Sequence, residues 1–325
     1  MNKQIKNKIA ILGGSGKLGK IIFRFIENLN KYQVYLIGRQ QMKTKSKKTI
    51  VTIINFESLE RTKQLKNILN NCDYIINCIG ENVHANKMHQ TNFILVKKIL
   101  SLLQPKSNLH LIHFSTCAVY GASSLLQSKD KNLFIEEGTV AKPNNLYEIT
   151  KYKAEKAILS KKNPFFYYTI IRPSQVLGIS MNNDSIKLLF FYLKYKLFHF
   201  IHTKETNWSY IFVDDLLILL RQCLEKKIAR NKIILISNHI KLKNLVLLIK
   251  KVYKISGKVF LIPISLVKFF QFFFKFLPIN FPLSEKTTQS LTSRTIYKSS
   301  KIILRLGLKK LKNIDARNIR TLLKK

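Results

Sequence analysis

A short apolar run that leads into three evenly spaced glycines constrains the fold more than any other feature of the chain. Residues 9–12 are Ile-Ala-Ile-Leu, and Gly13, Gly16 and Gly19 follow within the next seven positions. Apolar side chains then recur at helical spacing, at Leu18, Ile21, Ile22, Phe25, Ile26 and Leu29. The pattern predicts a buried parallel strand, a tight turn and an amphipathic helix.

Such a unit suits the binding of a dinucleotide. Backbone without Cβ atoms can turn sharply and approach a pyrophosphate, and the N–H groups at the helix start point at that anion. A glycine turn that serves the fold alone is the alternative, but the flanking strand and helix favour binding. We expect cofactor contacts from Gly13, Ser15, Gly16, Lys17, Leu18 and Gly19.

The end of the next strand indicates which dinucleotide is bound. Residues 33–37 predict a second strand, which ends in Gly38 and Arg39. In dinucleotide folds an acidic residue at this place binds the ribose 2′-hydroxyl, whereas an arginine accommodates a 2′-phosphate. We therefore favour NADP over NAD. The alternative is that Arg39 is an ordinary surface arginine.

Strands and helices alternate through the first half of the chain. Further strands are predicted at residues 49–54, 73–79, 109–114 and 166–171, and helices at 59–69 and 92–103. This alternation predicts an α/β fold with a doubly wound parallel sheet, in which ligands bind beyond the carboxyl ends of the strands. Residues at those ends are expected to contact the cofactor, namely Asn55 and Phe56 in the adenine pocket, Ile79, Gly80 and Pro173.

A candidate catalytic pair lies on a later helix. Residues 145–155 predict a helix start that places Tyr147 and Lys151 one turn apart on the same face. A cation at that distance favours the phenolate, so we expect it to lower the pKa of the phenol. Ser115 and Thr116 follow the fifth strand, and we expect their hydroxyls at the same crevice; capping of a turn is the alternative.

The alternation ends after the sixth strand. We place a Rossmann domain at residues 1–175 and a smaller C-terminal substrate-binding lobe at 176–325. Part of the segment after residue 213 is expected to return to the sheet, including the strand-like residues 232–237.

Two long aromatic helices are predicted in this second lobe, over residues 186–202 and 261–277. In the second helix, Lys268, Gln271 and Lys275 share one face, and the other side chains are strongly apolar. Such a helix suits peripheral contact with a membrane surface, helped by positive charge. We favour the alternative, a core helix of the lobe with one wetted edge.

The composition excludes several classes of protein. With 46% hydrophobic and 11% aromatic residues, the chain is globular rather than disordered. Its net charge of +40 comes from lysines spread along the whole sequence without a nucleic-acid module, so no nucleic-acid partner is expected. The four cysteines lack metal-like spacing, and neither a signal peptide nor a spanning segment is predicted. We expect a cytoplasmic protein without a metal.

Several motifs stand in order along the chain: Gly13-x-x-Gly16-x-x-Gly19, Ser115-Thr116 before Val119-Tyr120-Gly121, Tyr147-x-x-x-Lys151, Arg172-Pro173 and Val213-Asp214-Asp215. The series resembles the extended short-chain dehydrogenase/reductases, in the branch of NAD(P)-dependent nucleotide-sugar epimerases, dehydratases and reductases. The resemblance covers essentially the whole chain, including a tail at residues 297–307.

The resemblance implies a role for each matching residue. Tyr147 would be the general acid/base at a substrate hydroxyl or keto oxygen, and Lys151 would lower its pKa and bond the nicotinamide ribose. Thr116 would hold the same substrate oxygen, and Asn92 would support the site. A nucleotide-sugar substrate, a homodimer and a place in the synthesis of cell-surface polysaccharide sugars are also implied.

Departures from the family pattern narrow the reaction. Asn55 stands where an Asp is usual, and Trp208 replaces the arginine with which epimerases grip the diphosphate. Cys117 replaces the acidic residue of the 4,6-dehydratases, so that activity is not expected. Together with Arg39, these changes favour a reductase or dehydrogenase of a nucleotide-linked keto-sugar, with epimerisation close behind.

Two alternatives stay open. The aromatic second lobe and Trp208 suit a reductase of small hydrophobic carbonyls, such as flavonol- or steroid-like compounds. A non-catalytic, cofactor-binding subunit is the other alternative, although Tyr147 and Lys151 are both retained.

Overall fold

A seven-stranded sheet forms the centre of the larger part of the protein. The computed structural model describes residues 7–40, 42–44, 49–53, 59–106, 108–121, 133–161, 166–181, 183–274 and 285–324. The strand order is β11-β7-β5-β4-β1-β2-β3, and all neighbours are parallel. The strands are β1 (Lys8–Leu12), β2 (Gln33–Gly38), β3 (Thr49–Ile53), β4 (Tyr74–Asn77), β5 (His110–Phe114), β7 (Tyr167–Pro173) and β11 (Lys232–Ile236).

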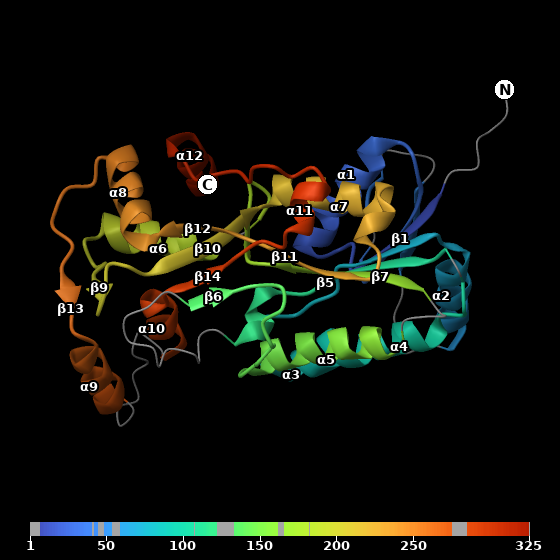
Figure 1. The fold of residues 1–325 in the computed structure, drawn as a ribbon, viewed down its shortest axis with the longest axis horizontal. Helices are drawn as coiled ribbons and strands as arrows, with labels where there is room; N and C mark the ends of the chain where they lie inside the picture. The colour runs from blue at the N-terminus through green and yellow to red at the C-terminus, as the bar shows by residue number, and fades with distance from the viewer. Residues whose placement is uncertain are drawn as a thin grey trace.

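Helices cover both faces of this sheet (Figure 1). One face carries α1 (Lys17–Leu29), α7 (Val213–Glu225) and α11 (Ile302–Arg305), and the other carries α2 (Leu59–Asn71), α4 (Leu95–Leu102) and α5 (Leu146–Lys161). Successive side chains of β1 point to opposite faces of the sheet: Ile9 and Ile11 pack against one helical layer, and Ala10 and Leu12 pack against the other. The predicted doubly wound parallel sheet is confirmed.

The helix predicted over residues 92–103 begins earlier than its apolar pattern indicates. It starts as α3 (Ala85–His89), passes through a π-helical turn (Gln90–Ile94) and continues as α4. Two short 3₁₀ turns, at Cys117–Tyr120 and Lys227–Ala229, connect other elements. The π-helical turn carries Asn92, and such turns are frequent at functional sites.

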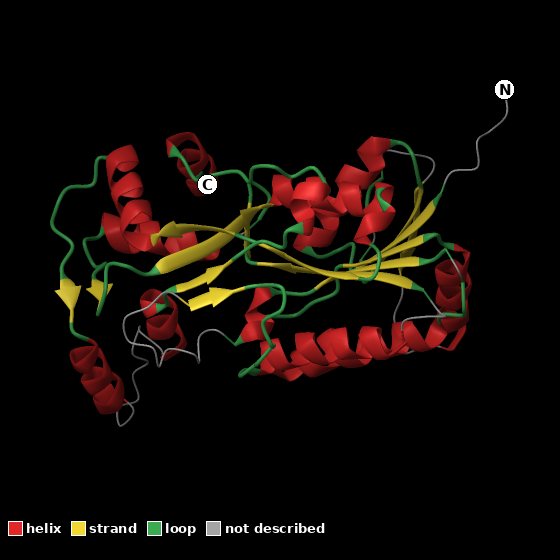
Figure 2. Ribbon diagram, viewed as in Figure 1, coloured by secondary structure: helices red, strands yellow, loops and turns green. Residues whose placement is uncertain are grey.

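The second lobe is built on small sheets (Figure 2). One has the order β12-β10-β8, and two pairs are β13-β9 and β14-β6. The strands of the lobe are β6 (Leu133–Ile135), which comes from before the expected boundary at residue 175 and pairs with β14, and β8 (Gln175–Leu177), β9 (Phe200–Ile201), β10 (Asn207–Phe212), β12 (Asn238–Lys241), β13 (Leu261–Ile262) and β14 (Thr295–Tyr297). Its helices are α6 (Asp184–Lys194), α8 (Leu242–Tyr253), α9 (Ile264–Phe274), α10 (Glu285–Thr292) and α12 (Ala316–Leu323). Helices α6, α8 and α12 share one hydrophobic core with β10.

The first long helix predicted in this lobe is shorter than expected. Helix α6 ends at Lys194 because Lys196 adopts a left-handed conformation, with φ 59°. The N–H groups of Leu197 and Phe198 both donate back to the carbonyl of Tyr192, at 2.8 and 3.2 Å. The sequence has no Gly or Pro at this stop, so its apolar pattern overextends the helix.

The second long helix also differs from its prediction. Helix α9 begins only after β13 and buries Val267 almost completely, whereas most of its other described side chains are exposed. Gln271, predicted on a wetted edge, donates to Thr288 of α10 at 2.9 Å. Lys275 lies outside the described residues. The favoured interpretation of α9 as a core helix is therefore wrong.

Across the part of the chain that the structure describes, we find no helix with both the length and the apolar character needed to cross a bilayer.

Candidate active site

The glycine turn after β1 lies between the ends of β2 and β4, the two strands that flank β1 in the sheet. The N–H groups of Gly13 and Gly14 donate to the carbonyl of Ile37 at the end of β2, at 3.0 and 3.2 Å. Gly13 has φ +78°, and a Cβ there would lie 2.9 Å from the backbone nitrogen of Ile79. A Cβ on Gly19 would lie 2.2 Å from the carbonyl oxygen of Gly13. A side chain at either position would push the turn and α1 away from the sheet.

The start of α1 has the form of an anion site. Gly16 is the residue before the helix and has no side chain to accept from its first N–H groups. Those groups belong to Lys17, Leu18 and Gly19, and the first N–H groups of a helix have no partner within the helix. The turn thus fits the pyrophosphate of a dinucleotide by its lack of Cβ atoms and by its donors.

Ser15 and Arg39 lie beside the turn, on the side where the adenosine end of a cofactor is expected. Ser15 contacts the end of β2, where a Cβ on Gly38 would lie 3.1 Å from the Ser15 hydroxyl oxygen. Arg39 follows and is exposed. Asn55 and Phe56, the predicted adenine-pocket residues, lie outside the described residues.

Helix α5 begins with a side-chain cap. The Asn145 side chain accepts from the N–H of Glu148 at 3.1 Å, and the Glu148 carboxylate accepts from the N–H of Asn144 at 2.9 Å. The reciprocal arrangement resembles a capping box and fixes where the helix starts. From this start, positions 147, 151 and 155 follow one another at intervals of one turn, on one face of α5.

Three consecutive residues at the end of β5 each bond one residue of this row. The pairs are the carbonyl of Phe114 with the ammonium of Lys151, the hydroxyl of Ser115 with the carboxylate of Glu155, and the hydroxyl of Thr116 with the phenol of Tyr147. The Lys151 bond is 2.6 Å long. The end of β5 and the face of α5 are therefore held in register over two helical turns.

This register corrects one prediction and extends another. The hydroxyl of Ser115 does not face the crevice, because it donates to the buried Glu155. Thr116 bonds Tyr147, and it also accepts from the N–H of Ala118 at 3.2 Å, which caps the 3₁₀ turn. The capping alternative is therefore observed, and the role of Thr116 at a substrate oxygen stays a prediction.

Burial shifts the pKa of both members of the catalytic pair. It raises the pKa of Tyr147 to about 12, while the bond to Thr116 acts in the opposite direction. It lowers the pKa of Lys151 to about 8, while the carboxylate of Glu155 acts against this. The predicted lowering of the Tyr147 pKa by Lys151 does not occur here, because the ammonium is directed to the carbonyl of Phe114.

Glu155 is the main residue that sequence reasoning missed. It is fully buried and forms an ion pair with Arg172, from Nε to Oε1 at 3.1 Å and from Nη2 to Oε2 at 2.5 Å. The Arg172 guanidinium also lies over the ring of Tyr120, at 4.9 Å from its centroid. The position of Glu155 one helical turn after Lys151 was the sequence signal that could have identified it.

Asn92 connects the end of β4 with α5. Its carbonyl oxygen accepts from the N–H of Glu81 at 2.8 Å, and its amide donates to the carbonyl of Glu81 and to the hydroxyl of Thr150, at 2.9 and 3.0 Å. A Cβ on Gly80 would lie 3.8 Å from both the Asn92 oxygen and the Lys151 nitrogen. The predicted residues Asn92, Gly80 and Lys151 are thus brought together.

A neutral histidine lies in the sheet next to this cluster. Asn77 accepts from the N–H of Ile79 at 3.0 Å, so its amide nitrogen is the group that faces Nδ1 of His113, at 3.1 Å. Burial holds the pKa of His113 well below its usual value, and the charge of Lys151 acts in the same direction. The ring is therefore neutral with its proton on Nε2, a buried atom without a hydrogen-bond partner among the described residues.

The structure also locates Pro173 and the two departures from the family pattern, Cys117 and Trp208. Pro173 ends β7 and is buried. Cys117 is buried beyond Thr116, and burial raises the pKa of its thiol to about 12. Trp208 lies on β10 and stacks on Tyr210, with ring centroids 5.7 Å apart. Among the described residues no group of His, Cys, Asp and Glu could hold a metal ion.

Solved structures with the same fold are numerous. The terminal R domain of the myxalamid PKS-NRPS biosynthetic pathway superposes with a TM-score of 0.71 at 14% identity, over 99% of this chain and 90% of that one. UDP-glucuronic acid 4-epimerase from Bacillus cereus, in complex with UDP-glucuronic acid and NAD, gives 0.70 at 14% identity, over 97% and 98%. ADP-L-glycero-D-manno-heptose-6-epimerase from Helicobacter pylori gives 0.67 at 17% identity, over 98% and 95%.

No curated protein sequence matches the chain. The sequence pattern of one family does match, over residues 9–237, which include the glycine turn, Thr116, Tyr147 and Lys151. By this match and its fold, the chain belongs to the NAD dependent epimerase/dehydratase family.

Proposed function

We propose that the protein is an NAD(P)-dependent oxidoreductase that acts at a carbinol or keto carbon of a nucleotide sugar, with Tyr147 as the proton carrier. The observation that carries this proposal is the contact of Tyr147 with Thr116, one turn from the buried ammonium of Lys151 and next to the end of β5. The nucleotide-sugar epimerases among the structural neighbours support the substrate class. A place in the synthesis of cell-surface polysaccharide sugars is part of the proposal.

The cofactor would lie across the carboxyl ends of the strands. Gly13, Gly16 and Gly19 would hold its pyrophosphate, and Ile79, Gly80 and Pro173 would border its nicotinamide half. A bound NAD(P) supplies or accepts the hydride. The chain itself supplies orientation and proton traffic.

The protonation states favour reduction of a ketone. At neutral pH a phenol with a pKa of about 12 is protonated, so Tyr147 starts as an acid toward a keto oxygen. Thr116 would hold the same oxygen. Lys151 is charged below about pH 8, and its ammonium would have to turn from the carbonyl of Phe114 toward Tyr147 to stabilise the phenolate that remains after proton transfer. Asn92 would keep the helix in position through Thr150.

Two further residues bear on the reaction and the cofactor. Cys117 is buried and stands where the 4,6-dehydratases carry an acidic residue, so elimination of water is not part of the proposal. The exposed Arg39 at the end of β2 would accommodate a 2′-phosphate and favours NADP. We therefore place a reductase ahead of an epimerase.

The acid/base role is tested with Tyr147→Phe, which removes the proton and keeps the ring. We expect turnover with a panel of nucleotide-linked keto-sugars to fall by about 10²–10⁴-fold. Binding of NADPH, followed by its fluorescence, should stay within a factor of two or so. Tyr195→Phe, at an exposed site of the second lobe, is the matched control. Full activity of Tyr147→Phe would refute the assignment.

A second pair of variants tests the cofactor and the reaction type. Arg39→Ala should weaken NADPH binding about tenfold and leave NADH binding unchanged, since only the 2′-phosphate contact is lost. Arg317→Ala, an exposed arginine on α12, is the control. With wild-type enzyme, net oxidation of NADPH in proportion to substrate indicates a reductase, whereas conversion of a sugar without it indicates an epimerase.

The small-carbonyl alternative is favoured by one observation. Trp208 occupies the position of the diphosphate-binding arginine and stacks on Tyr210. Strong competition by UDP or dTDP for the substrate pocket would exclude this alternative. The expected homodimer is a separate proposal, which light scattering after size exclusion would test.

A further inference from the structure

One end of the second lobe exposes a continuous run of apolar side chains, which we call the α9 face. It comprises α9 and the residues before it, on the part of the lobe that lies far from the seven-stranded sheet (Figure 1). Six of its side chains are between 46 and 63% exposed: Phe260, Leu261, Leu266, Phe269, Phe272 and Phe273. A contiguous exposed apolar surface of this kind marks an interaction site.

Other residues form the side of helix α9 that faces the protein. Ile264, Val267 and Gln271, at positions i, i+3 and i+7, form the side that faces the protein. The side chain of Gln271 bonds Thr288 of α10 on that side. The apolar residues of the α9 face lie on the remaining surface of the helix.

The sequence that contains this face carries charge of one sign. From Lys226 to Ser284 the sequence contains no Asp or Glu. Lys258, just before the face, and Lys268, on α9, are both exposed. An anionic partner is therefore favoured over a neutral or cationic one.

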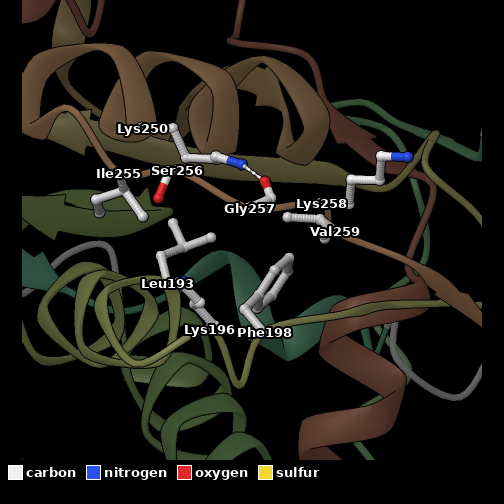
Figure 3. Close-up of a pocket in the computed structure, with 9 residues that line it drawn as sticks. All are labelled: Leu193, Lys196, Phe198, Lys250, Ile255, Ser256, Gly257, Lys258 and Val259. Carbon is white, nitrogen blue, oxygen red and sulfur yellow. Dashed lines mark hydrogen bonds between the residues drawn. The ribbon is translucent and has the colours of Figure 1, made fainter.

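A small pocket directly before Phe260 shows the same arrangement at close range (Figure 3). Its apolar wall includes Leu193 and Phe198, and its lysines are Lys196, Lys250 and Lys258. Lys250 donates to the carbonyl of Gly257, whereas Lys258 extends away from the pocket. Apolar and cationic groups thus lie together in the residues that lead to Phe260.

We propose that the α9 face binds the surface of an anionic phospholipid bilayer, with α9 lying in the plane of the interface. The phenylalanines would enter the boundary between headgroups and acyl chains, and the lysines would meet the lipid phosphates. At 11 residues α9 is too short to span a bilayer. This role is independent of the proposed chemistry.

A second copy of the chain fits this face less well. Two copies joined through it would bring the same lysines together, and each copy carries a net charge of +40. Like charges placed opposite one another oppose association. A bilayer rich in anionic lipid supplies the opposite charge over the whole face.

The test is flotation of the full chain with vesicles in about 0.15 M salt. We expect the wild type to float with phosphatidylcholine vesicles that contain phosphatidylserine, and to stay at the bottom with phosphatidylcholine alone. Hydrogen–deuterium exchange of the wild type should show slower exchange in α9 when the anionic vesicles are present. This second measurement needs no variant.

Two variants locate the binding surface. Leu266→Ser/Phe269→Ser/Phe272→Ser removes apolar groups, and its control is Ile218→Ser/Leu304→Ser, at exposed sites on α7 and α11. Lys258→Glu/Lys268→Glu reverses charge just before α9 and on it, and its control is Lys63→Glu/Lys66→Glu on α2. We expect each α9-face variant to lower the partition coefficient at least tenfold, and each control to change it less than threefold or so.

Three outcomes would overturn the proposal. The first is failure of the wild type to float with anionic vesicles. The second is equal loss of binding in the two charge-reversal variants, which would assign the effect to net charge. The third is loss of a dimer in light scattering when the phenylalanines are replaced, which would assign the face to a second copy.

Discussion

Where α5 meets β5 and β7 the cations lie inside the protein, whereas around α9 they lie at its surface. Lys151 and Arg172 are 3% and 5% exposed, and each is bonded to a fixed acceptor, the carbonyl of Phe114 and the carboxylate of Glu155. The lysines beside α9 are exposed and have no acidic residue near them in sequence. A buried charge must be bonded and so can position a reacting group, while exposed like charges act together as a field.

The largest difference between the two regions should appear when one member of a charge pair is removed. Glu155→Gln leaves Arg172 buried without its counter-ion, so we expect the free energy of unfolding to fall by about 3–5 kcal/mol. Glu136→Gln breaks the exposed ion pair with Lys298 and should leave the free energy of unfolding unchanged. Urea unfolding of both variants measures this. Equal losses of stability in the two variants would mean that burial does not strengthen the Glu155–Arg172 ion pair.

The pH dependence of stability should isolate Lys151. Its folded pKa of about 8 lies below the usual 10.5, so between these values the unfolded chain binds a proton that the folded chain does not. Stability from this group therefore rises with pH over that window, by on the order of 3 kcal/mol. Lys151→Met should remove the rise, as measured by urea unfolding at several pH values. Lys153→Met, at an exposed site of α5, should retain it.

A methyl group tests how tightly the cofactor turn is packed. Gly19→Ala places a Cβ against the carbonyl of Gly13 and should cost about 1–3 kcal/mol of stability. Dinucleotide affinity should fall about tenfold, because the turn must move away from the pyrophosphate. Gly138→Ala, where a Cβ meets nothing within 4 Å, should change neither quantity. Unchanged cofactor binding in Gly19→Ala would contradict the assigned pyrophosphate site.

The smallest expected effect is the difference in stability between substitutions on the two sides of α9. Val267→Ala, on the buried side, should lower the free energy of unfolding by about 1 kcal/mol. Phe269→Ala removes a larger side chain that is 62% exposed, and we expect a change within about 0.5 kcal/mol. The reverse order in thermal unfolding would show that α9 packs through its aromatic side.

Local patterns allowed much of the fold and part of the site to be predicted. The glycine turn, the strands of the large sheet and the helix that carries Tyr147 depend on residues near one another in sequence. Spacing alone put Tyr147 and Lys151 on one face. The end of α6 before Lys196 could not be predicted, because no Gly or Pro marks this stop. Before α9, Pro263 marks the start of the helix, but the apolar pattern runs across it into residues that pair as β13 with β9.

The sequence by itself determined the dinucleotide fold, its family and the candidates Tyr147 and Lys151, because these follow from periodicity and fixed spacing. Only the tertiary structure decided the partners of the α5 face, since Ser115 and Arg172, which bond Glu155, lie outside α5 in the sequence. It also decided the direction of each pKa shift, which depends on burial. The exposure of α9 could likewise not be read from the sequence, because an apolar pattern does not indicate whether the folded protein covers the helix.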